Sequence, residues 1–251
     1  NLSVETAHGL RAVRIGRIHM EEDAGKNVHD DVGVSNRSYV DFNRGGTPLV
    51  EIVTDPDLRH ASEASAFTRK VRNILRTIEV CDGNMEEGSL RCDANVSIRA
   101  VGDEKLGVRC EIKNLNSFRF LEQAIEYEID RQIDVIESGG EVAQETKLWD
   151  PTNRVTRTMR TKEDAHDYRY FPEPDLPDLF LDEDVIAGIK NTIPELPHQT
   201  YTRYVNEFAL NEEEACLLSD NPDMKTFYED AISRHANYKG VANWVTNELI
   251  R

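Results

Sequence analysis

The chain has 251 residues, of which 39% are hydrophobic, and its formal net charge is -17 at pH 7. So much acidic charge excludes nucleic-acid binding by bulk electrostatic attraction. Any contact with RNA has to be local or shared with a partner. No apolar run approaches the roughly 20 residues of a membrane span, and the first residues lack a signal peptide's basic and apolar blocks. We therefore expect no membrane contact and a cytoplasmic location, bacterial or the organellar equivalent. The four cysteines have no Cys-x-x-Cys spacing and are expected to be reduced core residues.

Three short segments in the first 54 residues are rich in β-branched or aromatic residues and predict strands: Arg14–Met20, Ser38–Phe42 and Pro48–Thr54. Turn residues lie between and after them, in Arg44-Gly-Gly-Thr and Asp55-Pro-Asp. The chain is therefore expected to begin with strands.

Acidic residues in two of these segments are candidate metal ligands. The first strand runs into Glu21, Glu22 and Asp23, and three adjacent acids suit either a solvated loop or a divalent cation. Glu51 interrupts the apolar run Leu49–Val53. Burying a lone carboxylate there is costly unless it is paired or bound to metal. Exposure at the edge of a sheet is the alternative for Glu51.

Two helices are predicted from apolar periodicity and capping residues. Ser62 is expected to cap the first helix and Ser117 the second, which Ser138-Gly-Gly ends. The apolar residues recur at helical spacing: Phe67, Val71, Ile74 and Ile78 in the first helix, and Leu121, Ile125, Ile129, Ile133 and Ile136 in the second.

The segments Ser89–Arg99 and Val108–Lys113 alternate strictly between apolar and polar residues. This is the period of a strand with one buried face. A polar turn with two glycines separates the segments, so an antiparallel hairpin is predicted. Its buried face would carry Leu90, Cys92, Ala94, Val96, Ile98, Val108, Cys110 and Ile112.

The opposite face of this hairpin would carry more charged groups than a solvated sheet face usually does. Its residues would be Arg91, Asp93, Asn95, Arg109, Glu111 and Lys113. Carboxylates suit a hard cation, and cationic forks suit phosphate. The segment Lys113-Asn-Leu-Asn-Ser leads into a helix, whose N-terminal N–H groups favour anions. The alternative is an ordinary wet face, with cross-strand ion pairs of roughly 0.2–1 kcal/mol each.

Beyond Glu145 the chain returns to polar strands and then reaches three closely spaced prolines. Before them, His166 and Arg169 lie in an aromatic and acidic cluster that is either functional or an interdomain anchor. After Asn191 the pattern is helical throughout, in Pro197–Phe208, Glu212–Leu218, Asp223–Arg234 and Gly240–Ile250. An α+β fold is predicted, with a catalytic domain at 1–191 followed by a small all-α domain at 192–251.

Five long motifs occur in order: His19–Lys26, Asp41–Val53, Met85–Ser97, Glu111–Phe118 and Asp167–Asp175. They closely resemble the B subunit of the glutamine-dependent aspartyl/glutamyl-tRNA amidotransferase. The resemblance runs from about Arg14 to the C-terminus and is looser after Asn191. The similar archaeal E subunit is disfavoured, because no inserted domain lies between Ile98 and Tyr170.

The resemblance implies an antiparallel-sheet catalytic domain of the glutamine synthetase/guanido-kinase type and a helical domain that helps to hold tRNA. It implies a ligase subunit that uses ATP and Mg²⁺ to phosphorylate the side-chain carboxylate of Glu or Asp misacylated on tRNA(Gln) or tRNA(Asn). Ammonia would then displace the phosphate. A separate amidase A subunit would make the ammonia from glutamine, and a small C subunit would complete the heterotrimer.

By motif, the resemblance implies that Glu22 and Glu51 are the metal ligands. Arg91 and Lys113 are candidates for stabilising charge on the γ-phosphate and the acyl phosphate, which is the main work of phosphoryl transfer. The hairpin argument adds further catalytic and nucleotide-contacting candidates: Asp93, Glu111, Asn114 and Asn116, with Lys113 again among the nucleotide contacts.

The family's earlier Gly-Leu-Glu-Val-His strand, whose Glu and His also serve the metal, is missing here, as is the C-terminal tail domain. The chain is therefore expected to be truncated at both ends and inactive alone. Two other functions compete with the ligase function. A kinase for small-molecule carboxylates or guanidines would turn over ATP without tRNA. In a scaffold for RNA and partner subunits, a change at Glu51 would alter stability or assembly but not chemistry.

Overall fold

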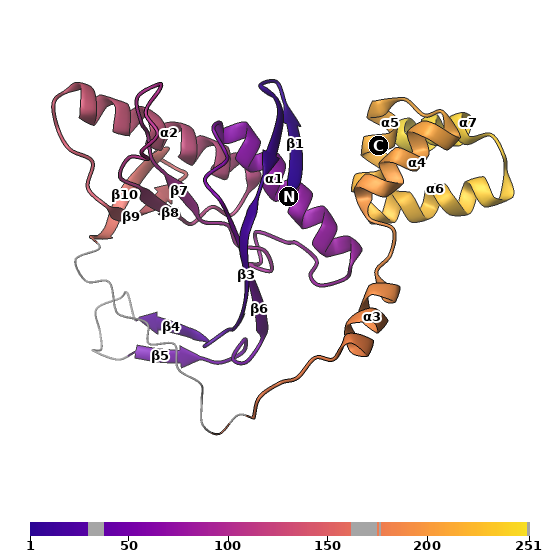
Figure 1. Cartoon of the computed structure of the whole chain (residues 1–251), viewed down its shortest axis with the longest axis horizontal. Coiled ribbons are helices and arrows are strands. Elements are labelled where there is room, and N and C mark those ends of the chain that lie inside the picture. Colours follow the sequence, from indigo (N-terminus) through magenta and orange to yellow (C-terminus); the bar gives the residue numbers. More distant parts are fainter. Residues whose placement is uncertain (30–37, 162–174, 176, 250–251) are drawn as a thin grey trace. The chain divides into compact units, whose positions relative to one another are not determined.

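The computed structural model describes residues 1–29, 38–161, 175 and 177–249. The chain divides into two compact units, residues 1–63 and 64–251, which are described separately (Figure 1). The predicted domain boundary at residue 191 stays a prediction. The cluster predicted around His166 and Arg169 lies outside the described residues. Within the described ranges, no helix is both long and apolar enough to cross a membrane.

In its described part, the first unit consists of antiparallel strand pairs: β1 (Leu2–Thr6) with β2 (Gly9–Val13), β3 (Ile15–Glu22) with β6 (Pro48–Thr54), and β4 (Lys26–His29) with β5 (Ser38–Asp41). The three predicted strands are confirmed as β3, β5 and β6. The sequence pattern predicts none of β1, β2 and β4, which are only four or five residues long.

Helix α1 (Ala61–Thr77) begins before the serine that was predicted to cap it. Ser62 lies inside the first turn, and its buried hydroxyl has no hydrogen-bond partner in the described structure. Glu63 Oε2 instead accepts hydrogen bonds from the backbone N–H of Arg59 (2.7 Å) and of His60 (3.3 Å). A first-turn carboxylate that reaches back in this way satisfies N–H groups at the helix start. The prediction of Ser62 as the cap is therefore wrong.

The second unit contains a four-stranded sheet in the order β10-β9-β8-β7, with β7 at Ala94–Val96, β8 at Cys110–Lys113, β9 at Glu145–Asp150 and β10 at Val155–Thr161. β7 and β8 form the predicted antiparallel hairpin, although both strands are shorter than the segments that predicted them. β8 and β9 run parallel, so the expectation of an antiparallel sheet is wrong at this pair. The reason is α2 (Phe118–Glu137), which connects them, because a crossover helix returns the chain in the same direction.

Helix α2 lies against the sheet and contacts β7 and β10 (Figure 1). Its predicted cap is confirmed, because Ser117 Oγ accepts a hydrogen bond from the Phe120 N–H at 3.1 Å. Gly139 follows the helix with a φ of +77°, a left-handed conformation that glycine adopts at helix ends. The predicted stop at Ser138-Gly-Gly is therefore confirmed.

The apolar stripe predicted along α2 is correct only in its first half. Leu121 and Ile125 are buried, but Ile133 and Ile136 are 38% and 50% exposed. Polar residues take the buried face instead, and these are Glu128 and Gln132. Both take part in hydrogen bonds between α2 and the sheet.

Replacing Ser117 with alanine is expected to lower the free energy of unfolding by about 1 kcal/mol, because the cap then leaves a helix N–H unpaired. Ser138→Ala is the matched control, since Ser138 Oγ only donates to the Asp134 carbonyl (2.7 Å) at the exposed end of the same helix. Urea unfolding of both variants tests this. Equal losses from the two changes would contradict the capping role.

The C-terminal part is helical, with α3 at Glu183–Thr192, α4 at Pro197–Phe208, α5 at Glu212–Asp220, α6 at Pro222–Arg234, α7 at Tyr238–Trp244 and a π-helical turn, η2, at Val245–Leu249. The four predicted segments after residue 191 are helical, whereas α3 was not predicted. Helices α4 to η2 share a core made of Tyr204, Leu210, Ala215, Leu218, Tyr228, Ala242 and Val245. Whether this part is a separate all-α domain, and whether the chain has the glutamine synthetase/guanido-kinase fold, stay predictions.

All four cysteines are free, as expected. Cys110 is buried, Cys81 and Cys92 are half-buried, and Cys216 is exposed. The expectation of core residues is therefore wrong for Cys216. It lies on α5, which turns its neighbour Ala215 and not Cys216 toward the core.

A cluster of charges joins the start of α4 to α6. The Arg203 guanidinium donates two hydrogen bonds to Glu195, at 2.8 and 2.6 Å, and Lys225 Nζ lies 3.1 Å from the same carboxylate. Arg203 also contacts Glu229. The hydrogen bonds from Arg203 are the largest influence on Glu195 and, with Lys225, lower its pKa to about 2.

The lowered pKa predicts that Glu195 contributes to acid stability. Its stabilisation should be present above the carboxyl's ordinary pKa of 4.5 and lost as the pH falls from there through about 2. Glu195→Gln should therefore melt at a lower temperature than the unchanged chain at pH 6, and the gap should close near pH 2. Melting curves followed by circular dichroism test this. A gap independent of pH would contradict it.

Candidate functional site

The face of the four-stranded sheet opposite α2 gathers polar side chains from all four strands. The register places Asn95 opposite Glu111, Glu111 beside Thr146, and Arg157 opposite Leu148. Paired residues on neighbouring strands share a face. We call this surface the polar sheet face and define it by Asp93, Asn95, Glu111, Lys113, Thr146 and Arg157.

Lys113 is the central cation of the polar sheet face. Its Nζ lies 2.5 Å from Asp93 Oδ2 and 3.1 Å from Glu111 Oε1. Burial would lower the pKa of Lys113, but the hydrogen bonds and charges of Asp93 and Glu111 outweigh it, so the pKa is raised above 10.5. The ammonium is therefore held in its charged form at neutral pH.

The two carboxylates around Lys113 differ in their surroundings. Glu111 is 21% exposed, and its second oxygen accepts a hydrogen bond from the Thr146 hydroxyl at 2.9 Å. Asp93 is 44% exposed, and Lys113 itself is 32% exposed. A ligand can therefore reach the ammonium and compete with Asp93 for it, while Thr146 holds Glu111 in place.

The two asparagines predicted to contact nucleotide take part in bonds within the chain. Asn114 has a φ of +68°, a left-handed conformation that asparagine tolerates better than most residues. Its Nδ2 donates to the Trp149 carbonyl at 3.0 Å, and its Oδ1 accepts from Asn116 Nδ2 at 3.1 Å. These bonds tie the end of β8 to β9. Nucleotide contact by either residue stays a prediction.

Arg91 precedes β7 and is exposed. The predicted contact between Arg91 and phosphate stays a prediction. Two members of the polar sheet face, Thr146 and Arg157, are absent from the sequence-based candidates. Arg157 is 64% exposed and pairs with Asp150 at 2.7 Å. Thr146 and Arg157 lie on this face because of the order of the strands in the sheet. The alternation of residues within one strand does not show that order.

The two candidate metal ligands lie in the first unit, on the ribbon formed by β3 and β6. The register pairs Glu51 with His19 and Glu22 with Pro48, so Glu22 and Glu51 point to opposite faces of the ribbon. Glu51 is 43% exposed and contacts the Arg17 guanidinium, so it is not a buried lone carboxylate. The structure thus agrees with the alternative that the sequence left open, an exposed Glu51.

No three His, Cys, Asp or Glu side chains in the described ranges converge on a position that a metal ion could occupy. The described ranges therefore add no further ligands to Glu22 and Glu51, and the roles of these two residues as metal ligands stay a prediction. The chemistry proposed for the chain is accordingly derived from its own side chains.

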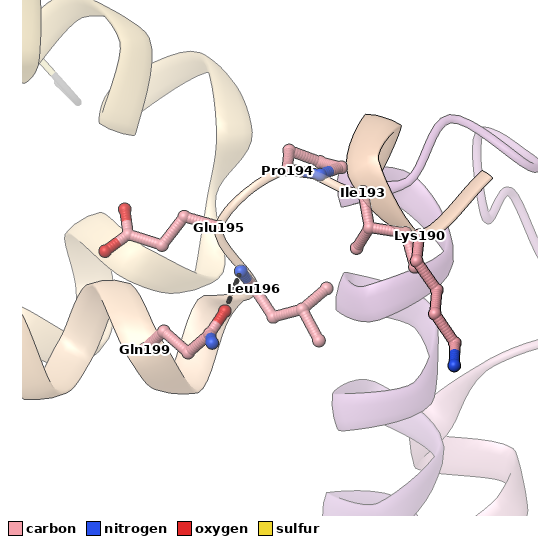
Figure 2. A pocket seen from close by; sticks show the side chains of 6 residues that line it. All are labelled: Lys190, Ile193, Pro194, Glu195, Leu196 and Gln199. Carbon is pink, nitrogen blue, oxygen red and sulfur yellow. Dashed lines mark hydrogen bonds between the residues drawn. The ribbon is translucent and has the colours of Figure 1, made fainter. Parts of the chain in front are cut away.

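Two hollows on the described surface lie away from the polar sheet face. The larger, about 480 Å³, is lined by residues of the connection between α3 and α4, among them Ile193, Pro194 and Leu196. Figure 2 shows the chain curving around it, with the Gln199 amide turned back to accept the Leu196 N–H at 2.9 Å. This bond closes the start of α4. The rest of the lining is polar, with Lys190 and Glu195 beside Gln199.

Comparison with known families decides what kind of protein carries this site. The model of the family described as "GatB/GatE catalytic domain" matches residues 1–187, which is most of the chain. The chain belongs to this family. The polar sheet face therefore lies inside a GatB/GatE catalytic domain, and the matched region ends near the predicted boundary at residue 191.

Members of this family with curated names are similar along the chain. The B subunit of the aspartyl/glutamyl-tRNA(Asn/Gln) amidotransferase from Thermodesulfovibrio yellowstonii is 53% identical over 241 residues, covering 96% of this chain and 50% of the relative. The protein of the same name from Myxococcus xanthus is 52% identical over 250 residues, covering 100% of this chain and 52% of the relative. The protein of this name from Halorhodospira halophila is 50% identical over 252 residues, covering 100% of this chain and 52% of the relative. The chain thus spans about half the length of these relatives.

Proposed function

We propose that this chain is the part of a tRNA-dependent amidotransferase subunit that activates the side-chain carboxylate of Glu or Asp carried by tRNA, with ATP as phosphoryl donor. Membership of the GatB/GatE catalytic domain family and the names of the relatives support the reaction class. The observation that carries the proposal is Lys113, held charged on an accessible sheet face between Asp93 and Glu111.

In the proposed reaction, an oxygen of the substrate carboxylate attacks the γ-phosphorus of ATP, and ADP leaves with the electrons of the broken bond. The product is an acyl phosphate. Ammonia then attacks its carbonyl carbon and loses a proton, and inorganic phosphate leaves with the oxygen that the carboxylate contributed. Neither step needs an oxidant or a reductant.

The residues of the polar sheet face serve the first step. Lys113 supplies positive charge where negative charge develops on the transferring phosphoryl group, which is the usual source of catalysis in such transfers. Asp93 and Glu111 keep it protonated and aim it, and Arg91 adds a second cation at the start of β7. Lys113, Glu111, Asn114 and Asn116 hold the nucleotide at the end of β8.

The proposed partners follow from the same reaction. Ammonia has to be supplied by a glutaminase activity. We propose an amidase A subunit as that source, a small C subunit as the third component, and misacylated tRNA(Gln) or tRNA(Asn) as substrate.

A chimaera tests the proposal, because the chain spans only about half of its relatives. The chain would replace the matching region of the Myxococcus xanthus protein, which is then assembled with the A and C subunits of that organism. ATP- and glutamine-dependent amide formation on Glu-tRNA(Gln) is expected, while the chain alone should form none. A folded, assembled chimaera without activity would contradict the proposal. ATP turnover without tRNA would indicate a small-molecule kinase instead.

A further inference from the structure

The second half of α1 is cationic, although the chain is strongly acidic. Residues 64–78 contain Arg69, Lys70, Arg72 and Arg76 and no Asp or Glu, in a chain of net charge -17. Arg72 follows Arg69 by three positions, and Arg76 follows Arg72 by four. This spacing places their side chains on one face of the helix. We call these three residues the arginine row.

An aromatic side chain supports the first two members of the arginine row. The Cζ atoms of Arg69 and Arg72 lie 4.1 and 5.9 Å from the centre of the Phe118 ring. Phe118 is the first residue of α2, next to the Ser117 cap. A guanidinium over an aromatic ring is attracted to its face and keeps its N–H groups available at the edge. The row therefore meets the N-terminal end of α2, which itself favours anions.

Arg72 is held in place by the loop that follows α1. Its Nε donates a hydrogen bond to the Gly83 carbonyl at 2.8 Å. The backbone of Gly83 packs so closely that a Cβ there would lie 2.6 Å from Arg72 Cγ. Arg69, in contrast, is exposed. The row thus combines one anchored guanidinium with one that solvent reaches.

Positive charge accumulates along this row. Burial, followed by the charges of Arg76 and Arg69, lowers the pKa of Arg72, and Asp82 offsets only part of this effect. Arg76 lies 3.8 Å from Asp223, whose side chain is 91% exposed. A long ion pair with so exposed a partner is worth little. A bound anion would relieve the repulsion among the three arginines.

We infer that the arginine row is a binding site for the phosphates of an RNA backbone, with Phe118 as its support. Arg76 lies seven positions after Arg69 in the helix, and at about 1.5 Å per residue the row spans about 10 Å. One phosphate group cannot reach both ends of such a row, whereas successive phosphates of one strand can. The forked guanidinium suits phosphate oxygens. The choice of RNA over another polyanion rests on the proposed function.

Binding of a transcribed, unacylated tRNA to the whole chain tests this inference. Fluorescence anisotropy would be measured at several salt concentrations, without ATP. Arg69→Gln should weaken binding about tenfold and reduce the slope of log affinity against log salt by about 1, as expected for one lost phosphate contact. Arg76→Gln should act in the same direction and provides a second variant if Arg69→Gln lowers the melting temperature.

Arg99→Gln is the matched control, because Arg99 is an exposed arginine in the loop between β7 and β8, where it donates to the Glu104 carbonyl at 2.7 Å. It removes the same charge away from the row and should leave the affinity unchanged. Equal losses from Arg69→Gln and Arg99→Gln, or no loss from either row variant, would overturn the inference. Displacement of the RNA by ATP at equal phosphate concentration would also overturn the inference, because it would show that the arginine row is a nucleotide site.

The result can be separated from that of the proposed function. A chimaera that forms no amide while the chain still binds RNA through Arg69 would reject the proposed function and retain the RNA site. An active chimaera whose activity and RNA affinity both survive Arg69→Gln would retain the function and reject the site.

Discussion

Replacing Lys113 with methionine is expected to slow carboxylate phosphorylation by the chimaera at least about 100-fold, the cost of losing one group that stabilises transition-state charge. Methionine keeps the length and the apolar stem of lysine and removes only the ammonium. Because Lys113 is 32% exposed and its ion pairs lie near the surface, the free energy of unfolding should change by less than about 1 kcal/mol. ADP release in single turnovers on Glu-tRNA(Gln) measures the effect.

Lys105→Met provides the control for this prediction. Lys105 is an exposed lysine in the loop between β7 and β8, so the substitution removes the same charge without touching the polar sheet face. It should leave the rate unchanged. Equal rates for the Lys113→Met chimaera and the unchanged one would remove Lys113 from the chemistry and leave its ion pairs as an ordinary cross-strand network.

Replacing Glu128 with alanine is expected to destabilise the chain by about 3–5 kcal/mol, the usual cost of removing one partner of a buried ion pair. Glu128 is fully buried, and Arg131 donates to its two oxygens at 2.6 and 3.0 Å. Thr156 and Gln132 each donate a further hydrogen bond to it at 3.0 Å. Burial would raise the pKa of Glu128, but these bonds outweigh it and lower the pKa, so the carboxylate is charged.

A double variant shows whether the ion pair itself causes this loss. Glu128→Leu with Arg131→Met replaces both charges by apolar side chains, which is often close to neutral for a buried pair. The double variant should therefore be more stable than Glu128→Ala in urea unfolding. A double variant less stable than the single one, or a single loss below about 1 kcal/mol, would show that the network does not hold α2 to the sheet.

This network connects stability to the candidate site. Thr156 belongs to β10, and Gln132 Nε2 also donates to the Val96 carbonyl of β7 at 3.0 Å, so Glu128 and Gln132 join α2 to both outer strands of the sheet. α2 begins at the end of β8, where Lys113 lies. Fixing the helix on the sheet therefore fixes the strand end that presents Lys113.

Short-range patterns predict much of the fold. Strict alternation predicted the β7–β8 pair and its two faces, and helical periodicity predicted α4 to α6. The same rules fail in α2, because periodicity favours Ile133 and Ile136 for the buried face. Glu128 and Gln132 are buried because they form hydrogen bonds with Arg131 on the same helix and with Thr156 and Val96 on the strands, and the strand partners are distant in sequence.

The candidate site was predictable only where it lies within one hairpin. Asp93, Glu111 and Lys113 come together because β7 and β8 pair as one hairpin and Asp93 directly precedes β7, so alternation alone brings them to one face. Thr146 joins them through the parallel pairing of β8 and β9, which depends on the path of α2. Glu51 was ambiguous for a related reason, since the sequence of a strand does not show whether another layer covers it.

The most direct test of the central claim follows an oxygen atom. Glu-tRNA(Gln) labelled with ¹⁸O in the side-chain carboxylate would be converted by the chimaera with ATP and glutamine, and the released inorganic phosphate analysed by mass spectrometry. If the carboxylate attacks the γ-phosphorus, one labelled oxygen has to appear in the phosphate, in an amount equal to the amide formed. Amide formation with unlabelled phosphate would contradict carboxylate activation at this site.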